Sequence, residues 1–325
     1  MSEVVFYLKD KLKGELIQTH SSFVIITDEF VYKIKKPVNF GFLDYSTLEK
    51  RLFYSYKELE INKRFCEDVY LGVIPIIKIN NTYELSKEDI DDALVVEYAV
   101  KMKRVKDELF MINKLNSLRE EDIKNVAKKI AYFHSQSKKM YDFDVFNQMK
   151  FNTDENFEQT KEFIGKTIEQ EDYDFIKDKV NSFYEKHKDL FYKRQKEGYV
   201  IDGHGDIRLE HVVIDKDNIC IMDAIEFNDR FRIQDQINDM CFLSMELDLK
   251  GYRDFAKIYE DTYESATKDE DFNMFLNFYK CYRAYVRGKV TSFLLKDPHI
   301  ENKDSAIQNA KKLFKLSKEY ADLIV

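Results

Sequence analysis

The spacing of apolar residues changes once along this chain, near residue 105, and this change constrains the fold more than any single motif does. Before it, short β-branched and aromatic runs predict strands, and two of these, 23–27 and 30–35, are separated by a two-residue hairpin signal. After it, apolar residues recur every three or four positions, which predicts amphipathic helices, except at 199–206, 212–215 and 219–223, where short strands and tight turns are expected. Strands followed by helices predict an α+β chain in two parts, which we place at 1–100 and 101–325.

The strand-rich part also contains one predicted helix, which begins at Ser46 and ends near Phe65. Its first letters, STLE, resemble a capping box. Four apolar residues share a face and are expected to pack inward: Leu48, Leu52, Tyr56 and Leu59. After this helix, 72–79 predicts one strand of a second hairpin and 93–98 predicts a short buried strand.

Composition excludes several classes of protein. The 9 Gly and 3 Pro are too few for the many turns of a β-sandwich. A net charge of −8 argues against a nucleic-acid binder, because phosphate contacts need clustered Lys and Arg. There is no run of about 18 apolar residues and no apolar signal core at the N-terminus. We therefore expect a soluble, cytoplasmic protein that does not enter a membrane.

The cysteines give no sign of a metal site or a disulfide framework. The four residues are Cys66, Cys220, Cys241 and Cys281, and none forms a CxxC pair. We expect them to be idle or buried free thiols. The sequence predicts nothing about the oligomeric state.

The strongest chemical signal is a pair of Asp residues, each of which follows a short apolar strand. Asp206 lies in the letters HGDIRLEH at 204–211, and Asp223 follows the strand 219–222. Phosphoryl transfer needs such a pair, because one carboxylate orients the attacking hydroxyl and the other holds Mg²⁺ against the ATP phosphates. The alternative is that both residues only cap turns, where Asp is common.

A Lys within a strand is the second signal. Lys33 lies in the strand 30–35, and Glu58 lies on the helix that follows. A kinase uses a strand Lys, tethered by a helix Glu, to bind ATP phosphates. Lys35 shares the strand face of Lys33, and we prefer Lys33 to Lys35 and Glu58 to the neighbouring Glu60. The alternative is a Lys on an edge strand, where its charge discourages aggregation.

Two other parts of a nucleotide site are less clear in the sequence. Residues 97–100 are expected to end the last strand of the first part, where the backbone of Glu97 and Ala99 would pair with adenine. A glycine-rich lid over the phosphates is missing, and 19–22 stands in its place before the first predicted strand. No Gx4GK[ST] pattern occurs, which excludes a P-loop.

Together these residues resemble the aminoglycoside-phosphotransferase and choline-kinase-like branch of the kinase fold. The resemblance rests on HGD at 204–206, on Asp223 and on DMCFL at 239–243. Further segments resemble an uncharacterised bacterial family of that branch: YKIKKPVNFGFLD at 32–44, YLGVIP at 70–75, DAIEFN at 223–228 and YRAYVRGK at 282–289. Some of its members carry a C-terminal P-loop ATPase domain, which we do not expect in a chain that ends at Val325.

The resemblance implies a two-lobed protein-kinase-like fold and a role for each matching residue. Asp206 would be the catalytic base and Asp223 a metal ligand. Lys33 would clamp phosphate with Glu58. Asp239 would support the catalytic loop, with His204 packed beneath it.

One position departs from the wider pattern, because His211 stands where an Asn is usual. Imidazole is a poor ligand for Mg²⁺, which prefers oxygen. The second metal is then absent, or is held by another carboxylate such as Glu226, or His211 contacts phosphate or substrate instead. A non-catalytic nucleotide-binding protein is a further alternative.

Three arginines are candidates for contacts with substrate. Arg208 stands beside Asp206, and Arg283 and Arg287 are four residues apart on a predicted helix. Arg binds phosphate with its planar fork, so an anionic substrate is one hypothesis, although the acidic net charge suits a cationic one. The alternative is that Arg283 and Arg287 are solvated or ion-paired.

The function predicted from the sequence is transfer of the ATP γ-phosphate to a hydroxyl of an unidentified small molecule. ATP and Mg²⁺ are the expected cofactors, with Mn²⁺ as an alternative ion. Two alternatives on the same fold remain open, namely a nucleotide-binding pseudokinase and an enzyme that transfers AMP.

Overall fold

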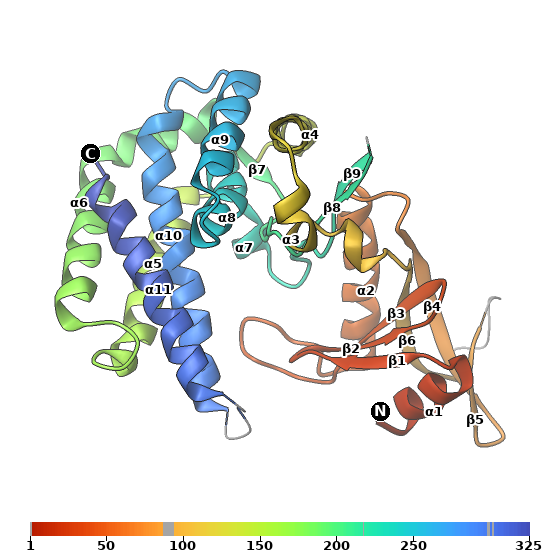
Figure 1. The fold of residues 1–325 in the computed structure, drawn as a ribbon. Helices are drawn as coiled ribbons and strands as arrows, with labels where there is room; N and C mark the ends of the chain where they lie inside the picture. Colours follow the sequence, from red (N-terminus) through yellow and green to blue (C-terminus); the bar gives the residue numbers. More distant parts are fainter. Residues whose placement is uncertain (1, 87–93, 217, 298–299, 301) are drawn as a thin grey trace. The chain divides into compact units, whose positions relative to one another are not determined.

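The computed structural model describes residues 2–86, 94–216, 218–297, 300 and 302–325, and its chain forms two compact units (Figure 1). The first unit combines Met1–Lys114 with Glu210–Arg232, and the second combines Leu115–Leu209 with Ile233–Val325. The division expected from the sequence, at about residue 100, differs from this, because the segment 210–232 packs with the N-terminal part. The chain therefore passes from one unit to the other more than once.

The first unit is built on a six-stranded antiparallel sheet of order β1-β2-β3-β6-β4-β5. Its strands are β1 (Glu15–Gln18), β2 (Ser22–Ile26), β3 (Phe30–Lys35), β4 (Tyr70–Ile79), β5 (Thr82–Leu85) and β6 (Val95–Lys103). The predicted hairpins are confirmed, and residue 93, the expected start of the last strand, lies outside the described residues. Helix α1 (Ser2–Leu12) and strand β1 were not predicted.

Alternation along β3 sorts its side chains between the two faces of the sheet. Tyr32 and Ile34 enter the apolar core, which also contains Val5 and Leu8 of α1. Lys33 and Lys35 consequently share the opposite face. Because β3 pairs with a strand on each side, the interpretation of Lys33 as an edge-strand residue is wrong.

Helix α2 (Leu48–Lys63) buries a polar face rather than the predicted apolar one. The buried residues recur at helical spacing and are mostly polar or charged: Arg51, Ser55, Glu58, Ile61 and Asn62. Tyr56, expected to pack inward, is exposed. The cap is Thr47 rather than Ser46, since its side chain accepts a hydrogen bond from the backbone N–H of Lys50. Buried polar side chains need hydrogen-bonding or charged partners, so further polar residues are expected beneath this helix.

The remaining elements of the first unit are short. The hairpin of β8 (Val212–Asp215) and β9 (Asn218–Ile221) confirms the strands expected there, although residue 217 of its turn lies outside the described residues. The other elements are η2 (Asp107–Leu109), α3 (Met111–Lys114) and α7 (Asp229–Arg232).

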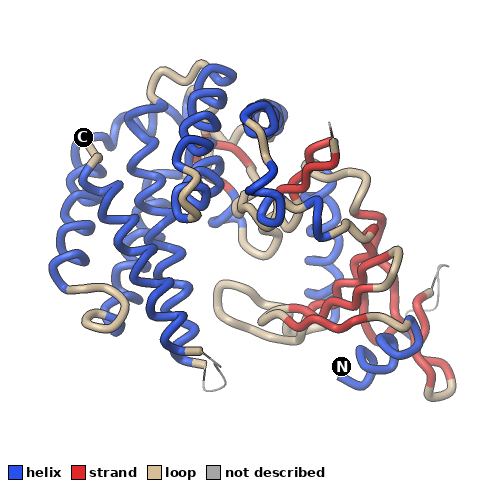
Figure 2. Tube along the Cα trace, in the orientation of Figure 1, coloured by secondary structure: helices blue, strands red, loops and turns tan. Residues whose placement is uncertain are grey.

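The second unit is mainly helical, as the colours of Figure 2 show. Its long helices are α4 (Glu120–Gln136), α5 (Val145–Thr160), α6 (Gln170–Lys196), α8 (Gln236–Leu249), α9 (Arg253–Thr267), α10 (Phe272–Phe293) and α11 (Lys303–Asp322). Short 3₁₀ turns accompany them, namely η3 (Leu115–Ser117), η4 (Lys161–Phe163) and η5 (Leu294–Lys296). Strands β7 (Val200–Asp202) and β10 (Ile233–Asp235) pair antiparallel within this unit.

Aromatic rings fix α6 against α10. The ring of Phe183 stacks on Phe278 at 4.3 Å between centroids, and Phe191 meets Phe275 edge to face at 4.9 Å. Such pairs favour these geometries because of the ring quadrupole. Within the described part of the chain, no helix has the length and apolar character needed to cross a membrane.

Candidate functional site

In the first unit, the Lys33 ammonium lies between two carboxylates. Its Nζ is 2.7 Å from Oδ1 of Asp223 and 2.9 Å from Oε1 of Glu58. The Glu58 side chain is fully buried, whereas that of Asp223 is 50% exposed. The predicted pairing of Lys33 with Glu58 is therefore present, and Asp223, far away in the sequence, joins it. One end of this chain of charges is sealed in the protein and the other faces solvent.

Lys35 extends the same network inward. Its Nζ lies 2.7 Å from Oε2 of Glu58 and also contacts the Glu226 carboxylate. The hydroxyl of Tyr45 donates to Glu226 at 2.6 Å. Glu226, expected to meet substrate or a second metal, is instead buried and bonded to Lys35 and Tyr45. Glu58 thus holds both strand lysines, so the choice made from sequence between Lys33 and Lys35 was too narrow.

Burial and charge act against each other in this network. Burial alone would lower the pKa of Lys33, but the carboxylates of Asp223, Glu58 and Glu226 outweigh it and raise that pKa well above its usual value. Burial would raise the pKa of Glu58, but Lys33 and Lys35 hold it below its usual value. Both groups are therefore charged at neutral pH.

The backbone at Asp223 has a conformation that suits few residues. Its φ is +63°, in the left-handed region that non-glycine residues rarely adopt. The hydroxyl of Tyr70 accepts a hydrogen bond from the Asp223 N–H at 3.0 Å. Burial, Asp223 and Glu58 raise the pKa of Tyr70 well above its usual value, which keeps this hydroxyl protonated. Tyr70 begins the segment 70–75 that contributes to the family resemblance, but the sequence predicted no role for it.

A divalent ion fits the Asp223 carboxylate better than it fits His211. Mg²⁺ commonly binds one or two carboxylates together with substrate phosphates and water. His211 Nε2 lies 3.8 Å from Oδ2 of Asp223 and 3.8 Å from Oε1 of Glu210. Among the described residues, no group of three or more His, Cys, Asp or Glu side chains is placed to hold a metal ion. Asp223 would therefore share such an ion with phosphate oxygens.

In the second unit, the loop that contains Asp206 is held by Asp239 of α8. The Asp239 carboxylate accepts the backbone N–H of His204 at 2.7 Å and that of Gly205 at 2.8 Å. A Cβ at Gly203 would stand 2.4 Å from Asp239 Oδ2, so only glycine fits there. The buried His204 ring accepts the Asp206 N–H at 3.2 Å. The segment GHGD at 203–206 thus forms a loop in which Asp206 is partly exposed while the three residues before it are buried.

Two partners of Asp239 were not identified from the sequence. His134 of α4 is fully buried, with Nε2 3.3 Å from Asp239 Oδ2 and Nδ1 2.7 Å from the Tyr263 hydroxyl. Gln234 donates to Asp239 at 3.0 Å. A His on the apolar face of a predicted helix was the only available signal, and such residues are usually structural.

Arg208 is held beside Asp206 by a residue that was also missed. Its Nε donates to Oε1 of Glu246 at 2.9 Å, while Nη1 lies 3.9 Å from Oδ2 of Asp206. The other Glu246 oxygen accepts the N–H of Leu209 at 2.9 Å. This geometry makes Arg208 a neighbour that offsets the charge of Asp206.

The two arginines of α10 differ in their surroundings. Arg283 is buried and donates to the Asn238 carbonyl at 3.0 Å and to Oε1 of Gln234 at 2.5 Å. It therefore supports the start of α8, which carries Asp239. Arg287 is partly buried. The phosphate role expected for both residues stays a prediction.

Comparison with known proteins gives distant relatives. No protein-family model matches this chain. Uncharacterized proteins of Mycobacterium tuberculosis and Mycobacterium bovis are each 26% identical to it over 278 residues, which is 84% of this chain. The chain spans about half the length of these curated relatives, 53% in each case.

Solved structures share the fold at lower identity. A choline kinase from Cryptosporidium parvum Iowa II has a TM-score of 0.57 at 12% identity, covering 100% of this chain and 96% of that one. A choline/ethanolamine kinase family protein from Mesorhizobium loti has 0.55 at 13%, covering 99% of each chain. The GDP complex of aminoglycoside 2'-phosphotransferase-IIIa has 0.55 at 10%, covering 97% of each. This chain has their protein-kinase-like fold. The predicted fold class is confirmed.

Within this kinase-like fold, two expectations about the nucleotide site need correction. Strand β6 does not end at 97–100 but continues to Lys103, so Glu97 and Ala99 lie inside the sheet. The Glu97 carboxylate is buried and paired with Arg51 at 2.9 Å. The adenine role therefore loses its basis at these residues. Residues 19–22 were expected to precede the first strand. Instead, 19–21 connect β1 to β2, and Ser22 is the first residue of β2.

Proposed function

We propose that this protein transfers the γ-phosphate of ATP to a hydroxyl group of a small molecule. The observation that carries the proposal is the Lys33 ammonium held between the buried Glu58 and the half-exposed Asp223. A Lys fixed by a buried Glu is the device that kinases use against ATP phosphates. The kinase-like fold supports the same reaction class.

Three residues would divide the work. Lys33 would neutralise phosphate charge, and Asp223 would hold Mg²⁺, which supplies further positive charge against the phosphates when it is bound. Asp206 would accept a hydrogen bond from the acceptor hydroxyl and take its proton as the bond to phosphorus forms. Catalysis would come mainly from positioning and charge neutralisation, because the phosphoryl group needs little covalent help.

Nucleotide binding tests the first part of the proposal. We expect MgATP to raise the melting temperature of the wild-type chain, because a ligand that binds only the folded state stabilises it. Asp223→Asn should abolish the shift, and so should EDTA. The matched control is Asp215→Asn, an exposed carboxylate in the β8–β9 hairpin that precedes Asp223. No shift with ATP or GTP in the wild type would contradict the proposal.

Product analysis tests the second part. Incubation with a pool of hydroxyl-bearing metabolites should yield ADP and a phosphorylated product detected by mass spectrometry. Asp206→Asn should keep the MgATP shift but slow product formation by about 100-fold or more, the usual contribution of a general base. A product carrying AMP would replace phosphate transfer with AMP transfer. Binding without any product, in the wild type, would favour a pseudokinase.

A further inference from the structure

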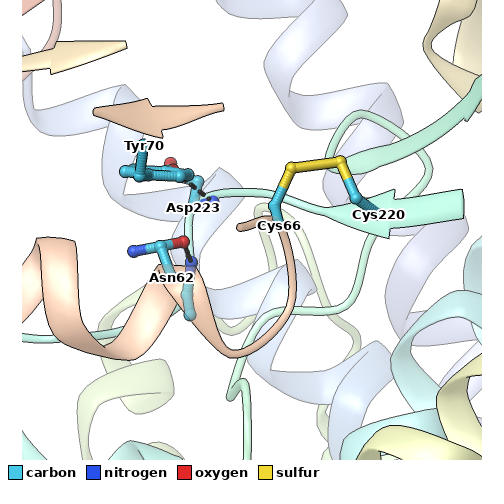
Figure 3. The surroundings of a disulfide bond; sticks show 6 residues. Asn62, Cys66, Tyr70, Cys220 and Asp223 are labelled. Carbon is cyan, nitrogen blue, oxygen red and sulfur yellow. Dashed lines mark hydrogen bonds between the residues drawn. A yellow bond between two sulfur atoms is a disulfide. The ribbon is translucent and has the colours of Figure 1, made fainter. Parts of the chain in front are cut away.

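Two cysteines that are far apart in the sequence meet within the first unit. Cys66 follows the end of α2, Cys220 lies in β9, and 154 residues separate them along the chain. Their Cα atoms are 4.7 Å apart, within the range that a disulfide spans, and their sulfurs are bonded (Figure 3). The expectation that all four cysteines are free thiols was therefore wrong for this pair.

The segment around Cys66 also holds the backbone of the turn at Asp223. The side-chain oxygen of Asn62, at the end of α2, accepts the N–H of Ala224 at 2.9 Å, and Tyr70 accepts the N–H of Asp223 (Figure 3). Ile221 donates its N–H to the carbonyl of Phe65 at 3.2 Å. The disulfide is the covalent member of this set of contacts.

These contacts matter because the turn they hold is unfavourable on its own. Asp223 has positive φ, so only its surroundings keep it in place. The same helix end is tied to Glu58, since the Asn62 amide donates to the Glu58 carbonyl at 2.9 Å. The disulfide thus joins the two segments that supply the carboxylate partners of Lys33.

We propose that the Cys66–Cys220 pair is a redox switch for the nucleotide site, in which the disulfide holds Asp223 and Glu58 around Lys33 and its reduction loosens them. The inference rests on the proposed function for its effect on nucleotide binding, but the change at the Asp223 turn does not depend on it. Reduction removes one tether, while the hydrogen bonds that Asn62 and Tyr70 accept from the backbone of Ala224 and Asp223 remain.

The chemistry balances with a small-molecule disulfide such as oxidised glutathione. One protein thiolate attacks a glutathione sulfur and releases one glutathione thiol. The second protein thiolate attacks the mixed disulfide and releases the other. Two electrons pass from the cysteines to glutathione, and their two protons leave with the released thiols. Cys220 is partly exposed and Cys66 is buried, so Cys220 is the sulfur that reacts first.

The other two cysteines provide matched controls. Cys241 and Cys281 are buried in the second unit and lack a disulfide partner. Burial raises the pKa of Cys241 well above its usual value and that of Cys281 to about 12, which makes both thiols unreactive. Substituting either one by Ser should leave redox behaviour unchanged.

The experiment compares the full chain after treatment with oxidised glutathione or with a thiol reductant, for the wild type, Cys66→Ser, Cys220→Ser and Cys281→Ser. The first readout is the Kd for MgATP. We expect it to rise about fivefold or more on reduction of the wild type and of Cys281→Ser, within the usual range of coupling between sites. Cys66→Ser and Cys220→Ser should have the reduced value under both treatments.

The second readout is hydrogen exchange of the peptide that covers β9 and Asp223. It should exchange faster in the reduced wild type even if the protein binds no nucleotide, which separates failure of the switch from failure of the proposed function. The proposal is overturned if mass spectrometry shows that the disulfide forms but neither exchange nor Kd changes. It is equally overturned if oxidised glutathione never forms the disulfide.

Discussion

Two charged clusters, one in each unit, differ in whether all their charged groups are shielded from solvent. In the second unit Arg194 is fully buried and binds both oxygens of Asp235 and both oxygens of Asp269, at 2.6 to 3.0 Å. In the first unit Lys33 binds the buried Glu58 but also Asp223, whose side chain is half exposed. One cluster satisfies its charges entirely within the protein. The other leaves carboxylate oxygen facing solvent.

This difference separates structure from function among buried ions. A closed cluster can only be broken, and breaking it leaves uncompensated charge in the interior. An open cluster can exchange a protein partner for a ligand such as a phosphate oxygen or a cation. Perturbed ionisable groups alone are a weak sign of function, and the exposed member makes the distinction here.

The largest expected effect is at Arg194. Arg194→Met should lower the free energy of unfolding by about 5 kcal/mol, because two buried carboxylates lose their partner. Urea unfolding of the full chain measures it. Lys193→Met is the control, since Lys193 is 47% exposed in its pair with Asp271 and its loss should have a much smaller effect than the loss of Arg194. A similar loss in both variants would remove the contrast between the clusters.

Substitutions of Lys33 and Lys35 test whether the exposed end and the buried end of the first unit's cluster contribute differently to the free energy of unfolding. Lys35→Met removes a lysine that is 1% exposed and should lower the free energy of unfolding by about 3 kcal/mol. Lys33→Met should lower it by only about 1 kcal/mol, because Glu58 keeps Lys35 and Asp223 meets water. The stabilisation by MgATP should disappear in Lys33→Met. Equal unfolding losses, measured in urea, would show that Lys33 is as structural as Lys35.

The pH dependence of unfolding tests whether Asp239, which holds the Asp206 loop, has its charge satisfied entirely within the protein. Burial would raise the pKa of Asp239, but His134 and His204 lower it from 3.8 to about 2. Because the pKa of Asp239 is lower in the folded state than in the unfolded state, the ionised carboxylate stabilises the folded state at a pH above about 4. This contribution is lost as the pH falls from about 4 to about 2. The shift corresponds to about 2 kcal/mol. Urea unfolding at pH 5, 3 and 2 should show this loss in the wild type, and an equal slope in Asp239→Asn would contradict it.

The smallest effect concerns the start of the helix that carries Glu58. Thr47→Ala should lower the free energy of unfolding by about 1 kcal/mol, since Thr47 caps α2. Ser46→Ala is the control, because the Ser46 hydroxyl donates to Asp44 outside the helix. Urea unfolding would decide between the observed cap and the cap expected from the sequence, since a larger loss in Ser46→Ala would favour the latter.

Local signals were enough for much of the fold. The strand predicted at 30–35 is β3, and the predicted kinase-like fold class is confirmed. The buried face of α2 was predicted wrongly, because helical periodicity favours apolar residues whereas Arg51 and Glu58 find their partners only in the folded protein. Helix α1 was missed because its charged residues obscured the buried Val4, Val5 and Leu8.

The site was predictable only where its chemistry has a local pattern. Lys33, Glu58 and Asp223 were named from sequence, and the structure brings them together. The contact of Lys35 with Glu226 joins residues 191 positions apart, and the contact of Asp239 with His134 joins two elements without a common motif. Neither pair of residues has a separation along the chain that a known sequence motif specifies. The same applies to the disulfide, whose cysteines lie in unrelated segments.

The path of the chain between its units has a consequence for synthesis on the ribosome. The first unit needs 210–232, so it stays incomplete while 115–209 is translated, which takes roughly 5–20 s at about 5–20 residues per second. During that interval Lys33 and Lys35 share Glu58 alone, and Cys66 has no partner. In a nascent chain halted before residue 210, Asn62 would therefore lack Ala224 and Lys35 would lack Glu226, while Glu58 and Arg51 of α2 would keep their other partners.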